Sequence, residues 1–493
     1  MLFSEDKKVL NFEGFLNEAK INKPNKPHVI MLIGGGTNEF SRSFESECKK
    51  KKIKVDVLDI DFTEVEKREG GHIIKNNGKS ININPESTVI IARSGVLKST
   101  HNKEVLTTLE EGRYFVVNRL RPMEICENKF ITCDFLERKG IPVPKYALIT
   151  SEVDVENAVK KIGGKFPVVM KLLTGSKGIG VSVVDSFNSL KSVYQTIKKL
   201  DETSEIMIQE KIKAKYDLRI HVLIKDVNIK DINHPGNFRI IGAMRRNAVG
   251  KDFRTNYSLG GTVGKVKLTK EIEEISFRAA SETGCNWSGV DIMIDEKTNK
   301  PYVLEVNSSP GTEGISKALG KPIVNDVIEF VMNRNNWILP DIQVGYLETV
   351  EIEGLGKVVG KFDTGNGTLC CCLHGDKIVE KGKTLNFEIG SKKFSKKIIG
   401  HTDVSGGIHS KGTVKHPTVE MDITFLDKTI TTEVAILDRT HKSTPFLINR
   451  KTMIKMNVVV NPDTKFIVTE KFDEEFNQYK SKGKPHAGIA FEK

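Results

Sequence analysis

A glycine-rich loop with a lysine beside it suggests phosphate chemistry. The stretch VVMKLLTGSKGIGVSVVDS, residues 168–186, places glycines between two β-type runs, and Lys171 stands just before the glycines. Backbone N–H groups of such a loop can close over phosphates, and a lysine can neutralise one. The loop lacks the Gly-x-x-x-x-Gly-Lys-Ser/Thr pattern of a P-loop, and a strand rather than a helix follows it. We therefore predict a flexible flap over a nucleotide.

A second pattern supplies hard oxygen ligands. In WSGVDIMIDEKTNKPYVLEVNSSPG, Asp291 lies in a strand-like run, and a second run after the turn DEKTNK carries Glu305 and Asn307. The last two are two residues apart, so they project to the same face of a strand. Oxygen donors suit Mg²⁺, or Mn²⁺ in its place, bound between protein and nucleotide phosphates. The alternative for any one of them alone is a structural hydrogen bond.

The elements that must position these residues are those of an α/β protein followed by an all-β region. HVIMLIGGG and IKVDVLDIDF read as strands with a helix-like stretch between them, which is typical of a parallel α/β layer. We favour a tight structural turn for the triple glycine. STVIIARSG and RYFVVNRL read as further strands of this layer.

Breaks in the pattern divide the chain into regions. We expect an α/β domain at 1–126, a second region of alternating strands and helices at 127–336 and an all-β domain at 343–470. The stretch NRNNWILPDI reads as the linker before the all-β domain, and 471–493 as a polar tail.

Composition limits the possible classes of function. The net charge of +12 would suit an acidic partner, although a lysine-rich proteome explains it equally well. Few aromatic residues accompany the basic ones, which argues against a nucleic-acid surface. Seven cysteines without a Cys-x-x-Cys pair argue against a zinc ribbon or a disulfide framework. With neither a signal-peptide core nor an apolar run of bilayer length, a cytoplasmic protein away from membranes is expected.

The order of the motifs resembles that of a known enzyme family. KLLTGSKGIGV, MIQEKI, YDLRIHVL, RRNAVGKDFRTN, SGVDIM and LEVNSSPGTEGI follow one another as in ATP-grasp ligases. They are most similar to the RimK-like branch, which contains ribosomal-protein glutamate ligases and related amino-acid ligases. The resemblance covers roughly 29–331, and it implies a pre-ATP-grasp α/β domain at 1–126 followed by a two-lobed ATP-grasp catalytic domain at 127–336. It departs at KIKAKYDLR, which is shorter, and at AVGKDFR, which is longer, so the substrate is not implied.

The resemblance implies a role for each matching residue. Expected ATP contacts are Lys129 and Lys171 at the phosphates, Gly178 and Gly180 in the flap, Glu210 and the backbone of Lys211 at the adenine, and Asp217 near the ribose. Arg254, Thr255 and Asn256 match the segment at the phosphate end, with Arg254 also expected in catalysis. Asp291, Glu305 and Asn307 match the family's Mg²⁺ ligands. Arg246 is expected to grip the acceptor carboxylate and stabilise the transferring phosphoryl group.

The chemistry implied is amide formation driven by ATP. A carboxylate takes the γ-phosphoryl group to give an acyl phosphate, and an amine then displaces phosphate. Lysine, arginine and Mg²⁺ neutralise the transferring group, and closure of the flap excludes water. No residue has to act as a covalent nucleophile.

The C-terminal region resembles the retropepsin-like β-barrel domain called "ATP-dependent zinc protease". Asp363-Thr364-Gly365 ends a strand-like run, and such a turn holds a catalytic aspartate in aspartic proteases. One copy per chain means that cleavage would require a homodimer. Asn366 and FLINRKTM depart from the family, so a non-proteolytic peptide-binding module stays open. The residues do not support zinc, since Cys370 to Cys372 would alternate across a strand.

Several functions remain open. The acceptor for an added amino acid such as glutamate is a peptide or protein in one hypothesis, and a free amino acid or small metabolite in another. A third makes the chain an aspartic-type peptidase regulated by its ATP-grasp part, and a fourth makes it a nucleotide-binding scaffold. An even-numbered homo-oligomer, a dimer or tetramer, is expected because RimK-like ligases are commonly tetrameric.

Overall fold

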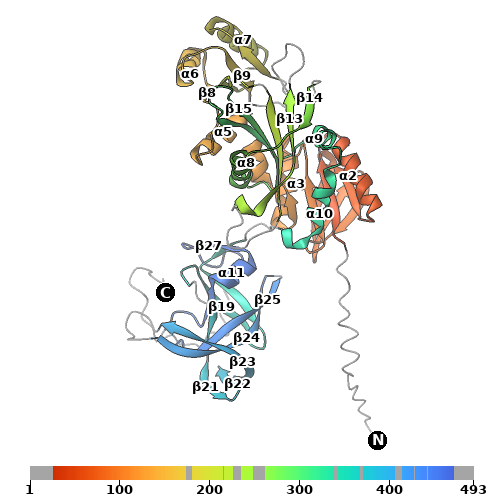
Figure 1. The fold of residues 1–493 in the computed structure, drawn as a ribbon. Helices are drawn as coiled ribbons and strands as arrows, with labels where there is room; N and C mark the ends of the chain where they lie inside the picture. Colours follow the sequence, from red (N-terminus) through yellow and green to blue (C-terminus); the bar gives the residue numbers. More distant parts are fainter. Residues whose placement is uncertain are drawn as a thin grey trace. The chain divides into compact units, whose positions relative to one another are not determined.

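The chain forms two compact units, Met1–Leu339 and Pro340–Lys493. The computed structural model describes residues 26–470, except 174–179, 215, 226–234, 248–260, 338–341, 367–369, 406–412, 427 and 441. The first unit is mixed α/β and the second is built mainly of strands (Figure 1). Within the described ranges, no helix has both the length and the apolar character needed to cross a membrane.

The first unit begins with a parallel sheet of strand order β2-β1-β6-β7. Its strands are β1 (His28–Ile33), β2 (Val55–Asp59), β6 (Thr88–Ala92) and β7 (Phe115–Val117), with helices α2 (Glu39–Lys50) and α3 (Thr100–Glu111). Along β1 the side chains alternate between two cores, with Val29 and Met31 in one and Ile30 and Leu32 in the other. A strand buried on both faces needs an unbroken apolar run, which explains the sequence HVIMLI. The predicted parallel α/β layer is therefore present.

A small antiparallel sheet that the sequence analysis did not anticipate interrupts this layer. It consists of β3 (Thr63–Arg68), β4 (Gly71–Asn76) and β5 (Lys79–Ile83), between β2 and β6 in the chain. The β4–β5 turn places both Asn77 and Gly78 at positive φ, +46° and +79°. Asn-Gly is the usual choice for such a tight hairpin turn.

Two further sheets carry the predicted nucleotide motifs. The four-stranded sheet β10-β9-β11-β8 comprises β8 (Tyr146–Ile149), β9 (Val168–Leu172), β10 (Val181–Val184) and β11 (Ile206–Glu210), and packs with α6 (Val155–Lys161) and α7 (Phe187–Leu200). The five-stranded sheet β14-β13-β12-β15-β16 comprises β12 (Asp217–Ile224), β13 (Phe238–Asn247), β14 (Thr262–Lys265), β15 (Trp287–Ile294) and β16 (Pro301–Asn307). Both predicted hairpins, β9–β10 and β15–β16, are antiparallel pairs.

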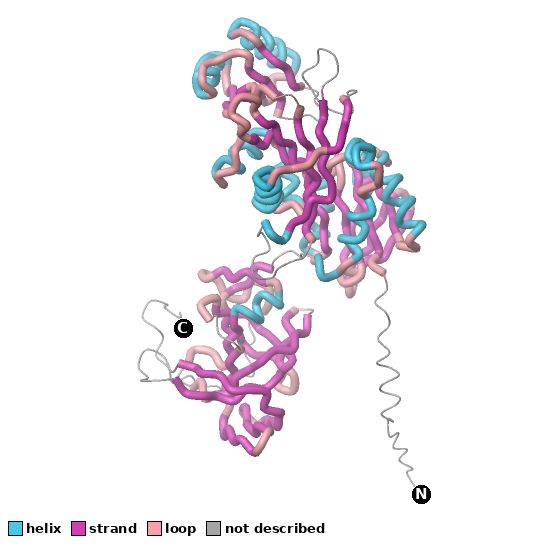
Figure 2. The backbone as a smooth tube through the Cα atoms, in the orientation of Figure 1, coloured by secondary structure: helices cyan, strands magenta, loops and turns pink. Residues whose placement is uncertain are grey.

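One hydrophobic core joins the parallel sheet to the five-stranded sheet. It contains Val29 and Phe115 from the parallel layer together with Leu218 and Val290 from the central strands. The Phe115 ring lies 5.5 Å from that of Trp337 and 5.8 Å from that of Phe330, centroid to centroid. Helices α4 (Leu120–Glu127), α5 (Lys129–Arg138), α8 (Lys270–Thr283), α9 (Glu313–Leu319) and α10 (Val324–Met332) complete this part of the unit (Figure 2).

The second unit contains a closed ring of strands. Its nine-stranded sheet has the order β18-β19-β26-β20-β25-β24-β23-β22-β21, and β18 also pairs with β24, which closes the first six strands. The strands are β18 (Leu347–Ile352), β19 (Gly356–Asp363), β20 (Cys371–His374), β21 (Asp376–Lys381), β22 (Thr384–Ile389), β23 (Lys392–Ser405), β24 (Thr413–Phe425), β25 (Lys428–Leu437) and β26 (Phe446–Asn449). Strands β17 (Ile342–Gly345) and β27 (Val458–Asn461) pair separately, and α11 (Arg450–Met456) is the one helix longer than a turn among the residues described in this unit.

Candidate active site

Charged residues occupy one face of the five-stranded sheet. On β12 the apolar residues Leu218 and Ile220 enter the core, while the residues between and beside them, Asp217 and Arg219, face the other way. Arg219 lies directly opposite Asp291 of β15 in the strand register. Arg219 Nε donates to Asp291 Oδ1 at 2.7 Å, and Nη2 donates to Oδ2 at 2.6 Å. This is the two-pronged geometry in which guanidinium–carboxylate pairs are strongest.

Arg246 connects two carboxylates across three strands. It lies opposite Asp217 in the pairing of β13 with β12, and its Nε and Nη2 reach Asp217 Oδ1 and Oδ2 at 2.6 and 2.9 Å. Its Nη2 also donates to Asp291 Oδ2 at 2.7 Å. The side chains of Arg246, Asp217 and Asp291 are each 4% exposed. Burial favours the neutral form of Asp291, but Arg219 and Arg246 hold its pKa well below the ordinary value.

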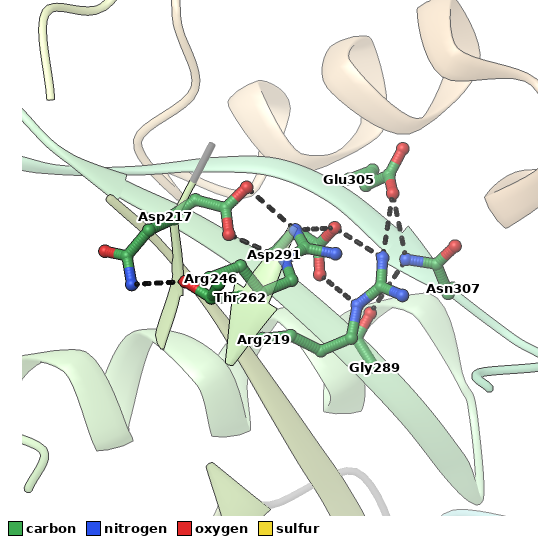
Figure 3. A network of polar contacts seen from close by, with 9 residues as sticks. Asp217, Arg219, Arg246, Thr262, Gly289, Asp291, Glu305 and Asn307 are labelled. Carbon is green, nitrogen blue, oxygen red and sulfur yellow. Dashed lines mark hydrogen bonds and ion pairs between the residues drawn. The ribbon is translucent and has the colours of Figure 1, made fainter. Parts of the chain in front are cut away.

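Glu305 and Asn307 extend this network along β16. Glu305 is paired with Asp291 in the register, and its Oε1 accepts from Arg219 Nη2 at 3.3 Å and from Asn307 Nδ2 at 3.1 Å. Asn307 Nδ2 also lies 3.3 Å from the carbonyl oxygen of Gly289. Figure 3 shows these side chains directed toward one another. Burial and the charge of Asp291 raise the pKa of Glu305 above the ordinary value.

Two lysines approach the same carboxylate from other elements. Lys129 begins α5, and Lys171 lies on β9, where its Nζ donates to Gln209 Oε1 at 2.6 Å. Burial lowers the pKa of Lys129, and the charges of Glu305 and Lys171 act on it in opposite directions. The structure thus brings Lys129, Lys171 and Glu305 within electrostatic reach of one another. The site therefore holds more positively charged side chains than carboxylates, as suits an anionic nucleotide. The cations are Lys129, Lys171, Arg219 and Arg246, and the carboxylates are Asp217, Asp291 and Glu305.

The acidic and amide side chains of this network are of the types that bind Mg²⁺. Asp291 and Glu305 stand opposite each other on adjacent strands, and their mutual repulsion contributes to the raised pKa of Glu305. Arg219 Nη2 already donates to both carboxylates, and a further cation beside Glu305 would relieve the remaining repulsion. Carboxylate and amide oxygens are the ligands Mg²⁺ takes. Glu305 and Asn307, with Asp291 behind them, therefore fit the ion. In the described ranges, this site included, no three His, Cys, Asp or Glu side chains gather in a way that could hold a metal, so the donor set here is two carboxylates and the amide of Asn307.

The remaining predicted contacts are only partly visible. Gly178, Arg254, Thr255 and Asn256 lie outside the described residues. Gly180 does lie within them, with φ at +78° and space so tight that a Cβ would stand 2.8 Å from Leu172 Cδ1. Both observations require glycine at this end of the flap. Glu210 ends β11 and Lys211 is exposed just after it, so their adenine contacts stay predictions.

The structure assigns partners to two expected ligand-binding residues. Asp217 is expected at the ribose and Arg246 at the acceptor carboxylate, yet both are almost fully buried and paired with each other. Their ligand contacts stay predictions. Within the protein, Arg219 and Arg246 hold Asp291 in its charged form.

Sequence reasoning missed two residues of this site. Arg219 contacts both Asp291 and Glu305, and Gln209 is 2% exposed and orients Lys171. Each had a recognisable signal. Arg219 is two residues from Asp217 and therefore on the same face, and Gln209 is a lone polar residue inside the apolar strand IMIQE.

A cavity of about 440 Å³ lies away from these residues. Its lining includes Glu39 and Ser43 of α2 and Glu313 and Lys317 of α9. None of the predicted nucleotide or metal residues that the structure describes lines it.

Asp363 belongs to the second unit. It ends β19 beside Asn449 of β26, and its Oδ1 accepts from the backbone N–H of Gly365 at 3.0 Å. The Asp363 side chain is half-buried, whereas Thr364 and Gly365 are exposed. A protease role for this turn stays a prediction.

Comparisons with known proteins place the first unit in a family. The RimK-like ATP-grasp domain model matches residues 126–331. A "Probable alpha-L-glutamate ligase" from Vibrio atlanticus is 32% identical over 305 residues, which cover 61% of this chain and 94% of that protein. The chain belongs to the RimK-like ATP-grasp family. A second relative, "Probable alpha-L-glutamate ligase 2" from Pseudoalteromonas atlantica, is 30% identical over 57% of this chain and 86% of its own length.

Solved structures similar to this RimK-like chain include other ATP-grasp ligases. One is the ATP-grasp ligase PsnB complexed with a phosphomimetic variant of a minimal precursor, Mg and ADP, with 16% identity and a TM-score of 0.48 over 63% of this chain and 100% of that one. Another is a RimK domain protein from Sphaerobacter thermophilus, with 15% identity and a TM-score of 0.45 over 61% and 98%.

Family membership makes this chain an ATP-grasp carbon–nitrogen ligase that uses ATP with Mg²⁺. Glu305 and Asn307, with Asp291, would hold the metal, which neutralises phosphate charge when bound. Lys129, at the start of α5, and Lys171, on β9, add positive charge near Glu305, and Arg219 and Arg246 keep Asp291 ionised. In these roles the residues would bind and orient, and none would have to form a covalent bond with the substrate.

Proposed function

We propose that this RimK-like ligase adds an amino acid, with glutamate the first candidate, to a peptide or protein acceptor. ATP would activate a carboxylate as an acyl phosphate, and the amine of the second substrate would displace phosphate. The arrangement that carries this proposal is the gathering of Lys129 and Lys171 near Glu305, because positive charge beside the candidate metal ligands would neutralise phosphate charge. The relatives' name, alpha-L-glutamate ligase, supports glutamate.

The direct test is ATP turnover with each amino acid in turn. Phosphate release would be measured with Mg²⁺, with and without a peptide or cell-lysate acceptor, and products would be identified by mass spectrometry. A peptide or protein product heavier by one glutamyl residue is expected. A product formed from free amino acids alone would replace the peptide acceptor with a small metabolite.

We propose that the second unit presents the acceptor. Asp363 lies at a strand end with exposed residues following it, an arrangement compatible with contact to an extended peptide. Cleavage by Asp363 is the alternative, and it would require a second copy of the chain. Mass spectrometry of the same peptides separates the two, because cleavage gives two fragments and binding gives none.

A further inference from the structure

One side chain of the parallel layer holds both strands of the metal-binding hairpin. Asn118 follows β7, is 1% exposed, and lies far in sequence from the residues it contacts. Its Nδ2 donates to the carbonyl oxygens of Trp287 and Ser308, each at 2.6 Å. Its Oδ1 accepts from the backbone N–H of Trp287 at 3.1 Å. The amide therefore pairs with Trp287 as a neighbouring strand would, and also binds the residue after Asn307.

These contacts lie where the hairpin needs support. Trp287 begins β15 and Ser308 follows the last residue of β16, so Asn118 bridges the open end of the pair. The register between the strands shifts at Asp291 and Ile292. On the metal side of that shift, three pairings connect the strands: Asp291–Glu305, Val290–Val306 and Gly289–Asn307.

A second contact from the same layer acts nearby. Arg93, 3% exposed at the end of β6, donates from Nη2 to the carbonyl oxygen of Pro310 at 2.8 Å. Its guanidinium lies 4.1 Å from the Phe40 ring centroid and 4.7 Å from that of Trp287. The segment after Asn307 is thus held at Ser308 and again at Pro310.

We propose that Asn118 is a positioning residue for the metal site, which rests on the proposed assignment of Asp291, Glu305 and Asn307. By fixing the open end of the hairpin, Asn118 keeps Glu305 and Asn307 on one face and opposite Asp291. Outer-shell partners of this kind act on metal affinity through the ligands they orient. Binding of nucleotide without metal does not depend on Asn118.

The test compares Asn118→Ala with Asn102→Ala. Asn102 is a matched control because it is also fully buried in the parallel layer and donates two hydrogen bonds there, to Asp61 and to the Gly95 carbonyl. Binding of a fluorescent ATP analogue would be measured without metal and across a Mg²⁺ titration. Asn118→Ala is expected to raise the dissociation constant for Mg²⁺ about 10–100-fold. The dissociation constant of Asn118→Ala for nucleotide without metal should stay within about twofold of wild type. For Asn102→Ala, the dissociation constants for nucleotide and for Mg²⁺ should both stay within about twofold of wild type.

Two further measurements keep the outcomes distinct. Glu305→Gln must raise the dissociation constant for Mg²⁺. If it does not, the assignment of the metal ligands is wrong, and the proposed role of Asn118 is wrong with it. If Glu305→Gln acts and Asn118→Ala weakens both constants equally, only the positioning role is overturned. Hydrogen exchange of the metal-free wild type needs no variant. The Trp287 backbone amide should exchange as slowly as the strand interior, and exchange at the rate of an exposed loop would contradict the proposal.

Discussion

Arg246 and Asp291 form a buried ion pair that spans the strand lying between them. Arg246 is on β13 and Asp291 on β15, on either side of β12, and Nη2 lies 2.7 Å from Oδ2. Asp217 on β12 accepts from the same guanidinium. The central sheet therefore carries these charges as one connected network.

Loss of Arg246 should destabilise the first unit. Arg246→Ala leaves Asp217 and Asp291 buried with one fewer partner, and breaking a buried pair typically costs about 3–5 kcal/mol. Urea unfolding monitored by tryptophan fluorescence reports on this unit, because Trp287 and Trp337 are the chain's two tryptophans and both lie there. Arg245→Ala is the control, since Arg245 is exposed on the same strand. Equal stability of the two variants would show that Arg246 has no structural role.

Glu305→Gln should separate stability from metal binding. The folded-state pKa of Glu305 is raised, so its ionised form costs stability as the pH rises through that pKa. The glutamine variant lacks this cost, and without metal at neutral pH it should unfold at the same or a higher temperature than wild type. Addition of Mg²⁺ and nucleotide should stabilise wild type only, and ATP turnover should fall at least about 100-fold. Exposed Glu329→Gln is the control, and should behave as wild type in both assays.

His221 should make the first unit sensitive to mild acid. It is fully buried beside Trp287, and burial lowers its pKa from 6.5 to about 3. Below pH 6.5 the unfolded chain binds a proton that the folded chain does not, so stability is lost as the pH falls from 6.5 toward 3. From pH 7.5 to pH 5 the loss should be about 2 kcal/mol in urea unfolding. His221→Gln should lose less over this range, whereas exposed His101→Gln should follow wild type; identical pH profiles for all three would refute the assignment.

Gln209 should set the affinity for ATP through Lys171. Gln209→Leu keeps the apolar volume but removes the acceptor of the Lys171 ammonium, 2.6 Å away. A hydrogen bond to a charged group is worth about 1.5–3 kcal/mol, so the KM for ATP should rise about tenfold or more. Met207→Leu, a buried change on the same strand, should leave KM unchanged. A fall in kcat with constant KM would place Gln209 in the chemical step instead.

Asp363 should be independent of ligation. Asp363→Asn keeps an oxygen to accept from the Gly365 N–H but removes the titrating carboxyl group, which an aspartic protease requires. Phosphate release should stay within about twofold of wild type, and peptide cleavage, if the wild type shows any, should disappear. Cleavage retained by the variant would exclude Asp363 as the catalytic group.

The hairpins of the site could be predicted from sequence because turn residues interrupt their apolar runs. DEKTNK separates the strands of Asp291 and Glu305, and glycines separate the β9 and β10 runs. Alternation along β16 was enough to place Glu305 and Asn307 on one face. In the second unit, short runs between polar turns predicted strands, and the structure shows a closed ring of them.

Partners from distant strands were not predictable in the same way. Arg219 meets Asp291 because β12 lies beside β15, and strand order is not encoded in the periodicity of either strand. Asn118 was missed for the same reason, since its three bonds are to backbone groups that any sequence would have. The β3–β5 sheet was missed because its strands are polar and partly exposed.

The core shared by the parallel layer and the central sheet has a consequence for how this ligase can be divided. The family match begins at residue 126, inside α4, after both Arg93 and Asn118. A fragment cut there would expose the apolar residues that meet Val29 and Phe115, and would leave Trp287 and Ser308 without their amide partner. Chimeras of this chain should therefore be joined at the boundary between the two compact units rather than at residue 126. Chimeras joined there should retain a working ligase module, whereas those joined at residue 126 should not fold.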